Sequence, residues 1–199
     1  MMWSLSAYRS VFIAVGLIGV ILCLVPAAVM LVPAPDAERF SELYILGPGH
    51  KAEDYPFNMS EGNNYSVILG VGNHMANSMY YGVYVKFRNS TESLANSTTS
   101  SSLPALYDYR VFLRDGQVWE GNLTFSFSNI VFNGNSSYVG GIRVNNVEFG
   151  LDKTATWDNE SSGYYYQLFV ELWEYDQTGN GLFYHGRFAS LWLNMTSSA

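Results

Sequence analysis

The chain has 199 residues, of which 48% are hydrophobic, 16% aromatic and only 14% charged, with a net charge of −7. This apolar and aromatic content excludes a disordered chain, because burial of such surface offsets the entropy lost on folding. Lys and Arg number 10 against 17 acidic residues, which excludes a basic nucleic-acid-binding surface. The length is that of one domain with a short appendage.

The N-terminal part contains an uncharged apolar run at residues 11–32. At about 1.5 Å of rise per residue, a helix of this length crosses a bilayer core of about 30 Å. Arg9 precedes the run, whereas Asp36 and Glu38 follow it. The positive-inside rule therefore predicts a transmembrane helix with a cytoplasmic segment at 1–10 and an external chain after it.

A cleaved signal peptide is the competing interpretation of this run. The apolar region of such peptides has about 7–15 residues, fewer than are found here. Pro35 follows the small-residue site at 32–34, and proline disfavours cleavage. Leu22 precedes Cys23, where a lipoprotein needs a small residue. We therefore predict an uncleaved signal anchor in a single-pass cell-membrane protein that contacts membrane lipid, with residues 33–40 as a stalk.

Asn-X-Ser/Thr sequons are abundant after the apolar run. They include 8 of the 16 asparagines, far more than chance gives. The acceptors are Asn58, Asn64, Asn89, Asn96, Asn122, Asn135, Asn159 and Asn194. N-linked glycans are added outside the cytoplasm, so these positions agree with the predicted orientation. We expect a glycosylated extracellular domain at residues 41–199.

This domain consists of segments with alternating apolar and polar residues, separated by Gly, Asn and Ser clusters. Such alternation is typical of strands with one buried face. The predicted strands are 41–46, 65–71, 80–88, 107–114, 117–131, 138–151, 164–175 and 182–194. The fold class is therefore mainly β, an antiparallel immunoglobulin-like β-sandwich of about eight strands.

The same alternation assigns side chains to faces of the strands. It predicts that Val83, Val85 and Phe87 face the core, whereas Lys86 and Arg88 face solvent. It also predicts that the Asn122 sequon is exposed. The external part has no cysteine, so we expect apolar burial alone to hold the core. The aromatic residues expected in the core are Trp119, Phe125, Phe127, Phe169 and Trp192.

Two turn signals and one loop stand out among the connections. Asp115-Gly116 and Asn180-Gly181 are pairs that favour tight hairpin turns. Residues 89–104 are rich in Ser and Thr and carry two sequons. We predict that they form a flexible glycosylated loop with little to bury.

The segment ELYILGPGHKAEDYP at residues 42–56, followed by Gly72-Asn73-His74, is distinctive. It resembles an archaeal family of membrane-anchored proteins known as domain of unknown function 1616. The match is good over Glu42–Phe87 and weaker at a closing hairpin of residues 167–172 with 188–193. The resemblance implies an archaeal cell-surface protein with a β-sandwich, and it implies no activity or catalytic residue.

One candidate binding loop lies within that segment. His50, Lys51, Glu53 and Asp54 gather between residues 47 and 56, as in a polar contact or cation site at the membrane-proximal end of the domain. The same residues also fit a fixed turn whose charges lie in solvent, because Gly and Pro set its backbone angles.

Metal sites have little support in the sequence. His50, His74 and His185 are far apart, whereas a zinc site normally includes a closely spaced pair of ligands. Residues 176–181 match the first half of a calcium loop, but Arg187 stands where the bidentate Glu is needed. We expect no metal and no cofactor.

Catalytic motifs have equally little support. The external part has no Cys nucleophile and no Gly-X-Ser-X-Gly motif. Glu171 and Glu174 fall on opposite faces of a strand, which separates their carboxylates. The run Tyr164–Tyr166 fits core packing better than an exposed platform for sugars. We expect no catalytic residue and no enzyme activity.

The leading hypothesis is a non-enzymatic interaction or scaffolding module of the archaeal envelope. Its partners would be a surface-layer protein, another envelope protein or a second copy. A pilin-like filament subunit, with the apolar helix as the filament core, is one alternative. A carbohydrate-binding accessory domain is another, with exposed aromatic residues around Tyr80, Tyr81 and Tyr84.

Overall fold

The computed structural model describes residues 5–31, 38–176 and 178–197. By its contacts the chain divides into two compact units, Met1–Glu38 and Arg39–Ala199. Most of the predicted stalk, the first four residues of the predicted cytoplasmic segment and the last residue of the apolar run lie outside the described residues.

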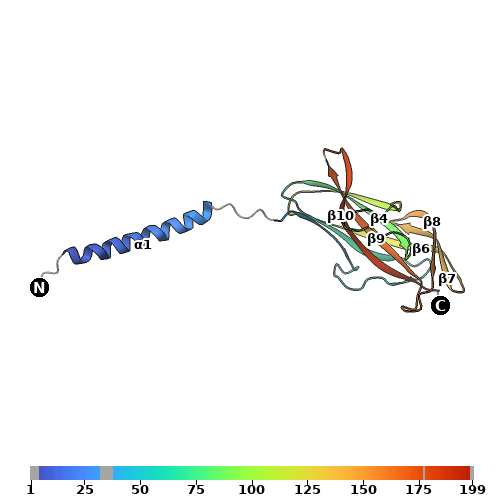
Figure 1. The fold of residues 1–199 in the computed structure, drawn as a ribbon. Helices are drawn as coiled ribbons and strands as arrows, with labels where there is room; N and C mark the ends of the chain where they lie inside the picture. Colours follow the sequence, from blue (N-terminus) through green and yellow to red (C-terminus); the bar gives the residue numbers. More distant parts are fainter. Residues whose placement is uncertain (1–4, 32–37, 177, 198–199) are drawn as a thin grey trace. The chain divides into compact units, whose positions relative to one another are not determined.

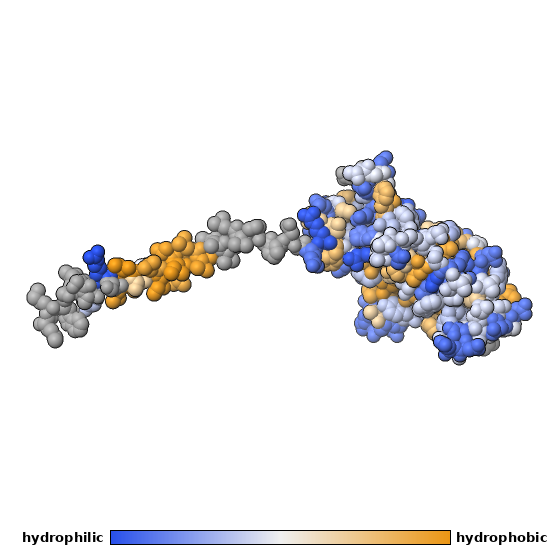
Figure 2. Space-filling model, viewed as in Figure 1, coloured by the Kyte–Doolittle hydropathy of each residue, from blue (hydrophilic) through white to orange (hydrophobic). Residues whose placement is uncertain are grey.

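The first unit contains helix α1 (Leu5–Leu31). Its side chains are described at residues 8–9 and 11–25, and Figure 2 shows that most of these are apolar. Over the residues whose side chains are described, no helix offers a long enough apolar stretch to cross a membrane. The transmembrane helix at 11–32 therefore stays a prediction.

The second unit is built from ten strands. They are β1 (Phe40–Leu46), β2 (Asn58–Met59), β3 (Tyr65–His74), β4 (Met79–Asn89), β5 (Tyr107–Leu113), β6 (Val118–Asn133), β7 (Ser136–Val144), β8 (Val147–Thr156), β9 (Tyr165–Asp176) and β10 (Gly181–Met195). The first sheet has the order β1-β3-β6-β7-β8 and the second sheet β2-β10-β9-β4-β5. All described pairings are antiparallel except that of β2 with β10. Figure 1 shows the strands of this unit, with β4, β6, β7, β8, β9 and β10 labelled.

The two sheets enclose one hydrophobic core, as the mainly β prediction requires. Val83, Val85 and Phe87 are buried in it, as alternation predicts. The Phe87 ring lies 5.3 Å from the Phe127 ring of the other sheet and stacks on Tyr166 at 5.5 Å. Two of the expected aromatic residues lie outside this core. Trp192 is 46% exposed, and Phe169 is buried on the opposite face of β9 from the core residues Leu168 and Val170.

Tyrosine hydroxyls also join the sheets, so the expectation of a core held by apolar burial alone is wrong. Tyr81 of β4 hydrogen-bonds with Ser41 of β1 at 2.7 Å and donates to Asn73 of β3 at 3.2 Å. Tyr166 of β9 donates to the Ser137 carbonyl of β7 at 2.9 Å. Buried hydroxyls need such partners, and here each partner belongs to the opposite sheet.

The predicted set of strands needs correction at two places. The short strand β2 was not predicted. Residues 138–151 form a hairpin instead of one strand, because Asn145 and Asn146 adopt φ values of 46° and 68°. Positive φ at two successive residues is the signature of a type I′ turn, which reverses the chain between β7 and β8.

The predicted Asp115-Gly116 turn forms, but it does not make a hairpin. Gly116 has a φ of 73°, and the Gln117 N–H donates to the Arg114 carbonyl at 3.1 Å. β5 belongs to the second sheet and β6 to the first, so this turn carries the chain from one sheet to the other. The Asn180-Gly181 turn does close a hairpin, between β9 and β10.

Residues 89–104 form a loop, as predicted, but the loop is held against the second sheet. Ala95 and Ser101 are buried, and the Tyr184 hydroxyl of β10 donates to the Asn96 carbonyl at 2.8 Å. Lys86 and Arg88 point away from the core, yet both are buried. Their predicted solvent exposure is therefore wrong.

The sandwich has two ends that differ in their connections. We call the end at which β1 begins the near end. It carries the connections at 75–78 and 114–117 and the turn residues 178–180, whereas β2, the turn at 134–135 and the connection at 157–164 lie at the far end.

Candidate functional site

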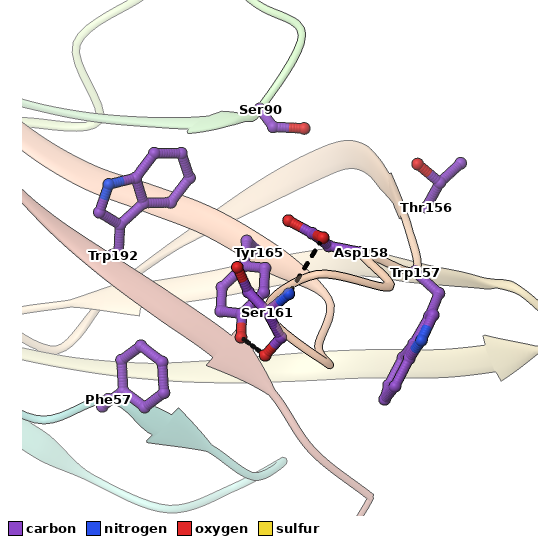
Figure 3. Close-up of a pocket in the computed structure, with 8 residues that line it drawn as sticks. All are labelled: Phe57, Ser90, Thr156, Trp157, Asp158, Ser161, Tyr165 and Trp192. Carbon is purple, nitrogen blue, oxygen red and sulfur yellow. Dashed lines mark hydrogen bonds between the residues drawn. The ribbon is translucent and has the colours of Figure 1, made fainter.

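A pocket of about 520 Å³ opens at the far end of the sandwich. We call it the aromatic pocket. It is lined by Phe57, Ser90, Thr156, Trp157, Asp158, Ser161, Tyr165 and Trp192. Figure 3 shows Trp192 and Phe57 on one side of this pocket, Trp157 and Thr156 on the other, and Tyr165, Ser161 and Asp158 between them.

Three of the four aromatic rings that line the pocket come from three separate segments. Phe57 precedes β2, Tyr165 begins β9, and Trp192 lies near the end of β10. The Tyr165 ring centre lies 6.1 Å from that of Phe57 and 6.4 Å from that of Trp192. Phe57 and Trp192 are each 46% exposed, so their rings are available to a ligand.

The polar side of the pocket is a tight turn after β8. Asp158 Oδ1 accepts hydrogen bonds from the Glu160 and Ser161 N–H groups at 2.8 and 3.2 Å. The Tyr165 hydroxyl donates to the Ser161 carbonyl at 2.5 Å. The turn therefore fixes both the Asp158 carboxylate and the Tyr165 ring (Figure 3).

The aromatic pocket was not predicted from the sequence, although the alternation of residues along the strands indicates that some of its rings face away from the core. Tyr164 and Tyr166 share a face and pack inward, as predicted, which leaves Tyr165 on the opposite face. The same rule separates Trp192 from the buried Leu193. The meeting of Phe57 with these strands depends on tertiary structure alone.

The candidate binding loop is a fixed turn. The Gly47 N–H donates to the Lys51 carbonyl at 2.8 Å, and the His50 N–H donates to the Gly47 carbonyl at 3.0 Å. A Cβ on Gly47 would lie 1.9 Å from the Glu53 carbonyl oxygen, so only glycine fits there. His50 and Asp54 adopt φ values of 58° and 56°.

The charged side chains of this loop do not converge. Lys51 Nζ lies 3.4 Å from Glu53 Oε1, and both side chains are exposed. His50 Nδ1 instead lies 2.8 Å from Glu120 Oε2 of β6. The loop leaves β1 at Leu46, the end of that strand opposite to Phe40. Its expected membrane-proximal position stays a prediction.

Glu120 is the centre of this small polar cluster. The Tyr44 hydroxyl donates to Glu120 Oε1 at 3.1 Å. The hydrogen bonds with His50 and Tyr44 lower the pKa of Glu120, because they stabilise its charged form. Burial and the hydrogen bond to Glu120 raise the pKa of Tyr44 to about 12.

The three histidines lie at separate places, each near a different glutamate. His74 Nε2 is 3.7 Å from Glu42, and His185 Nε2 is 3.4 Å from Glu174. Burial lowers the pKa of His185. Within the described part of the chain, no three His, Cys, Asp or Glu side chains are close enough to hold a metal ion.

The structure also places the carboxylate pair, the tyrosines proposed for a carbohydrate surface and the first residue of the incomplete calcium loop. Glu171 is buried beside Lys86, whereas Glu174 lies near His185. Tyr81 is in the core, and of the three tyrosines proposed for a carbohydrate surface only Tyr80 is exposed. Asp176 accepts hydrogen bonds from Thr178 in the turn of the β9–β10 hairpin.

The eight predicted glycosylation acceptors differ in exposure. Asn58, Asn64, Asn96, Asn122, Asn135 and Asn159 are exposed. Asn89 and Asn194 are partly buried, and their amide nitrogens donate to the Thr154 carbonyl at 2.9 Å and to Asn58 Oδ1 at 3.0 Å. Their occupancy by glycans stays a prediction.

The second unit is thus a two-sheet β-sandwich with an aromatic pocket at one end. Residues 34–131 match the family described as "Domain of unknown function (DUF1616)". The chain belongs to this family, as the resemblance of Glu42–Phe87 predicts. The archaeal origin stays a prediction.

No curated protein matches the chain. Among solved structures, a chain from the complex of Zinc 2-glycoprotein and Prolactin inducible protein from human seminal plasma aligns with a TM-score of 0.38 and 10% identity, over 82% of this chain and 100% of that one. Beta-glucosidase from Listeria innocua in complex with isofagomine aligns with a TM-score of 0.37 and 9% identity, over 83% of this chain and 17% of that one. Similarities this low say nothing about function.

Proposed function

We propose that the chain is a single-pass, N-glycosylated surface protein of the archaeal cell envelope. Its sandwich, immunoglobulin-like in architecture, is a non-enzymatic interaction module. The observation that carries this proposal is the aromatic pocket, because exposed rings fixed by turns and strands form the kind of surface that a partner covers. Asp158 is the single carboxylate among the lining residues, whereas glycoside hydrolysis uses two.

The anchoring part of the proposal rests on the first unit. Residues 11–32 carry no charge, and helix α1 covers most of them. The pocket lies at the far end of the sandwich, whereas the chain joins the sandwich at its near end. The partner of such an anchored domain is a surface-layer protein, another envelope protein or a second copy.

N-terminal peptide mapping of the protein from native membranes tests the anchor. A membrane-bound chain that begins at Met1 or Met2 is the expected result. A mature N-terminus at Ser10 or Val11 would contradict the signal anchor and favour a pilin-like subunit with the helix as filament core. Recovery of the intact chain in the soluble fraction would contradict both.

A further inference from the structure

We propose that the aromatic pocket is a saccharide-binding site that takes one or two sugar units from a glycan of another molecule. The choice of an external glycan rests on the proposed function, because a domain at the cell surface meets the glycans of other molecules. The argument from pocket chemistry to a saccharide stands on the described side chains alone.

The apolar part of the pocket fits the flat side of a sugar ring. A pyranose presents C–H groups on its face and hydroxyls around its edge, so it needs an aromatic surface beside polar groups. Trp192, Phe57 and Tyr165 supply three rings around one opening. Aromatic side chains give large contact area at low entropic cost, and the Phe57 and Trp192 side chains are exposed enough to meet a ligand.

The polar part of the pocket fits the hydroxyl edge. Asp158 Oδ1 is used by its own turn, whereas Asp158 Oδ2 accepts no hydrogen bond from the described residues. The hydroxyls of Ser90, Thr156 and Ser161 line the same pocket and make no hydrogen bonds to described residues. One carboxylate oxygen and three hydroxyls are thus available to accept from and donate to sugar hydroxyls.

A quaternary ammonium group is the main chemical rival, because aromatic rings and a carboxylate also attract cations. The volume and the three hydroxyls favour the saccharide. A pocket of about 520 Å³ is much larger than one ammonium group, and a cation gains nothing from hydroxyl donors. A saccharide uses the rings and the hydroxyls together.

The sugar could also come from the chain itself. Asn58 follows Phe57 and Asn159 follows Asp158, and both acceptors are exposed. A tethered sugar would have a high effective concentration and would exclude other ligands. The experiment therefore includes both the glycosylated chain and the chain made in a host that attaches no N-glycans.

The test is a titration of the full chain in detergent, followed by NMR of the tryptophan indole N–H signals. The probes are maltose, cellobiose, chitobiose and mannobiose, with choline as the rival. We expect at least one disaccharide to shift the Trp192 and Trp157 signals in both forms of the chain. Trp192→Ala is expected to weaken this binding by about tenfold or more.

Phe112→Ala is the matched control. Phe112 is 64% exposed and lies at the end of β5, at the near end of the sandwich. Its loss is expected to leave the saccharide affinity unchanged. Equal weakening by both variants would overturn the assignment to the aromatic pocket.

Three further results would overturn the proposal. Binding of choline but of no disaccharide would assign the pocket to cations, and no shift with any probe would refute the saccharide. Binding only by the unglycosylated chain, restored in the glycosylated chain by Asn58→Gln or Asn159→Gln, would show that the sugar is the chain's own. Each of these results leaves the proposed anchor intact, because N-terminal mapping tests the anchor separately.

Discussion

Lys86 and Glu171 form a buried ion pair between the neighbouring strands β4 and β9. Lys86 Nζ lies 2.9 Å from Glu171 Oε2, and the side chains are 5% and 0% exposed. Ser101 completes the cluster, since its carbonyl accepts from Lys86 and its N–H donates to Glu171 Oε1, both at 2.8 Å. The loop at 89–104 therefore closes over a buried charged pair.

Lys86→Met is expected to lower the free energy of unfolding by about 3–5 kcal/mol, because it leaves Glu171 buried without its cation. The control is Arg143→Met. Arg143 forms an exposed ion pair with Glu148 at 3.4 Å, and its loss is expected to cost less than about 1 kcal/mol. Urea unfolding of the two variants measures the difference. Equal losses would contradict the role given to the buried pair.

The Glu120 cluster predicts a pH dependence of stability. The pKa of Glu120 is lowered in the folded chain by hydrogen bonds with His50 and Tyr44. A lowered carboxyl pKa adds stability above the unfolded pKa, and this stability is lost as the pH falls through the folded value. Glu120→Gln is therefore expected to melt below the wild type near neutral pH.

The two melting temperatures are expected to converge on acidification, because Glu120 then loses its charge in the wild type also. Thermal unfolding between about pH 2 and pH 7 measures this convergence. A difference that stays constant over the whole range would contradict the account of the cluster.

At the scale of elements, the β7–β8 hairpin shows how one turn can also join the sheets. Asn145 Oδ1 accepts from the Thr124 N–H of β6 at 2.9 Å, and Asn145 Nδ2 donates to the Tyr109 hydroxyl of β5 at 2.6 Å. Tyr109 belongs to the second sheet, and burial raises its pKa. Asn146 is exposed and supplies only its backbone angles.

Because Asn145 makes side-chain contacts and Asn146 does not, we expect their replacement by glycine to change the free energy of unfolding by different amounts. Asn146→Gly keeps a positive φ and is expected to change the free energy of unfolding by less than about 1 kcal/mol. Asn145→Gly also keeps the turn but removes both side-chain contacts, at an expected cost of about 1–3 kcal/mol. Urea unfolding compares the two variants. A cost for Asn146→Gly as large as that for Asn145→Gly would contradict the inter-sheet role.

Alternation predicted the strands in which apolar residues occupy one face and polar residues the other, such as β4. The pairing of residues 167–172 with 188–193, which the family resemblance predicted, is confirmed within β9 and β10. Alternation failed at residues 138–151, because an Asn-Asn turn inside an alternating segment carries no Gly signal. It also could not distinguish a side chain that faces solvent from one that a distant loop covers, as at Lys86. Turn chemistry sets local φ values, so the Asp115-Gly116 pair predicted the turn but not the sheet of the next strand.

At the scale of the whole molecule, most contacts of the candidate sites could not be predicted from the sequence. The loop containing His50 was identified, but its contact with Glu120 joins residues 70 positions apart. The aromatic pocket combines the ends of β4, β8, β9 and β10 with the residue before β2. A pattern of period two places each ring on a face, but only the sheet order brings these rings together.

The two ends of the sandwich also differ in their sequons. Five of the eight lie in or next to far-end strands and connections: Asn58, Asn89, Asn135, Asn159 and Asn194. The near-end connections at 75–78 and 114–117 and the turn residues 178–180 contain none. If the chain is anchored as proposed, glycans are concentrated at the end that carries the aromatic pocket.

Exposure predicts which of these sequons are used. We expect glycans at exposed acceptors such as Asn58 and Asn159. We expect none at Asn194, because its amide nitrogen donates to Asn58 and its Oδ1 accepts from the Tyr164 N–H at 2.9 Å. Mass spectrometry of glycopeptides measures each site, and a fully occupied Asn194 would contradict this reading.

The central claim is that the sandwich is displayed outside the cell by an N-terminal anchor. Protease treatment of intact cells, followed by peptide mapping of the released and retained fragments, tests it most directly. The account predicts that glycosylated peptides from residues 39–199 are released, while the peptide before residue 11 stays protected until the cells are opened. Protection of the sandwich in intact cells, or release of the N-terminal peptide with it, would contradict the account.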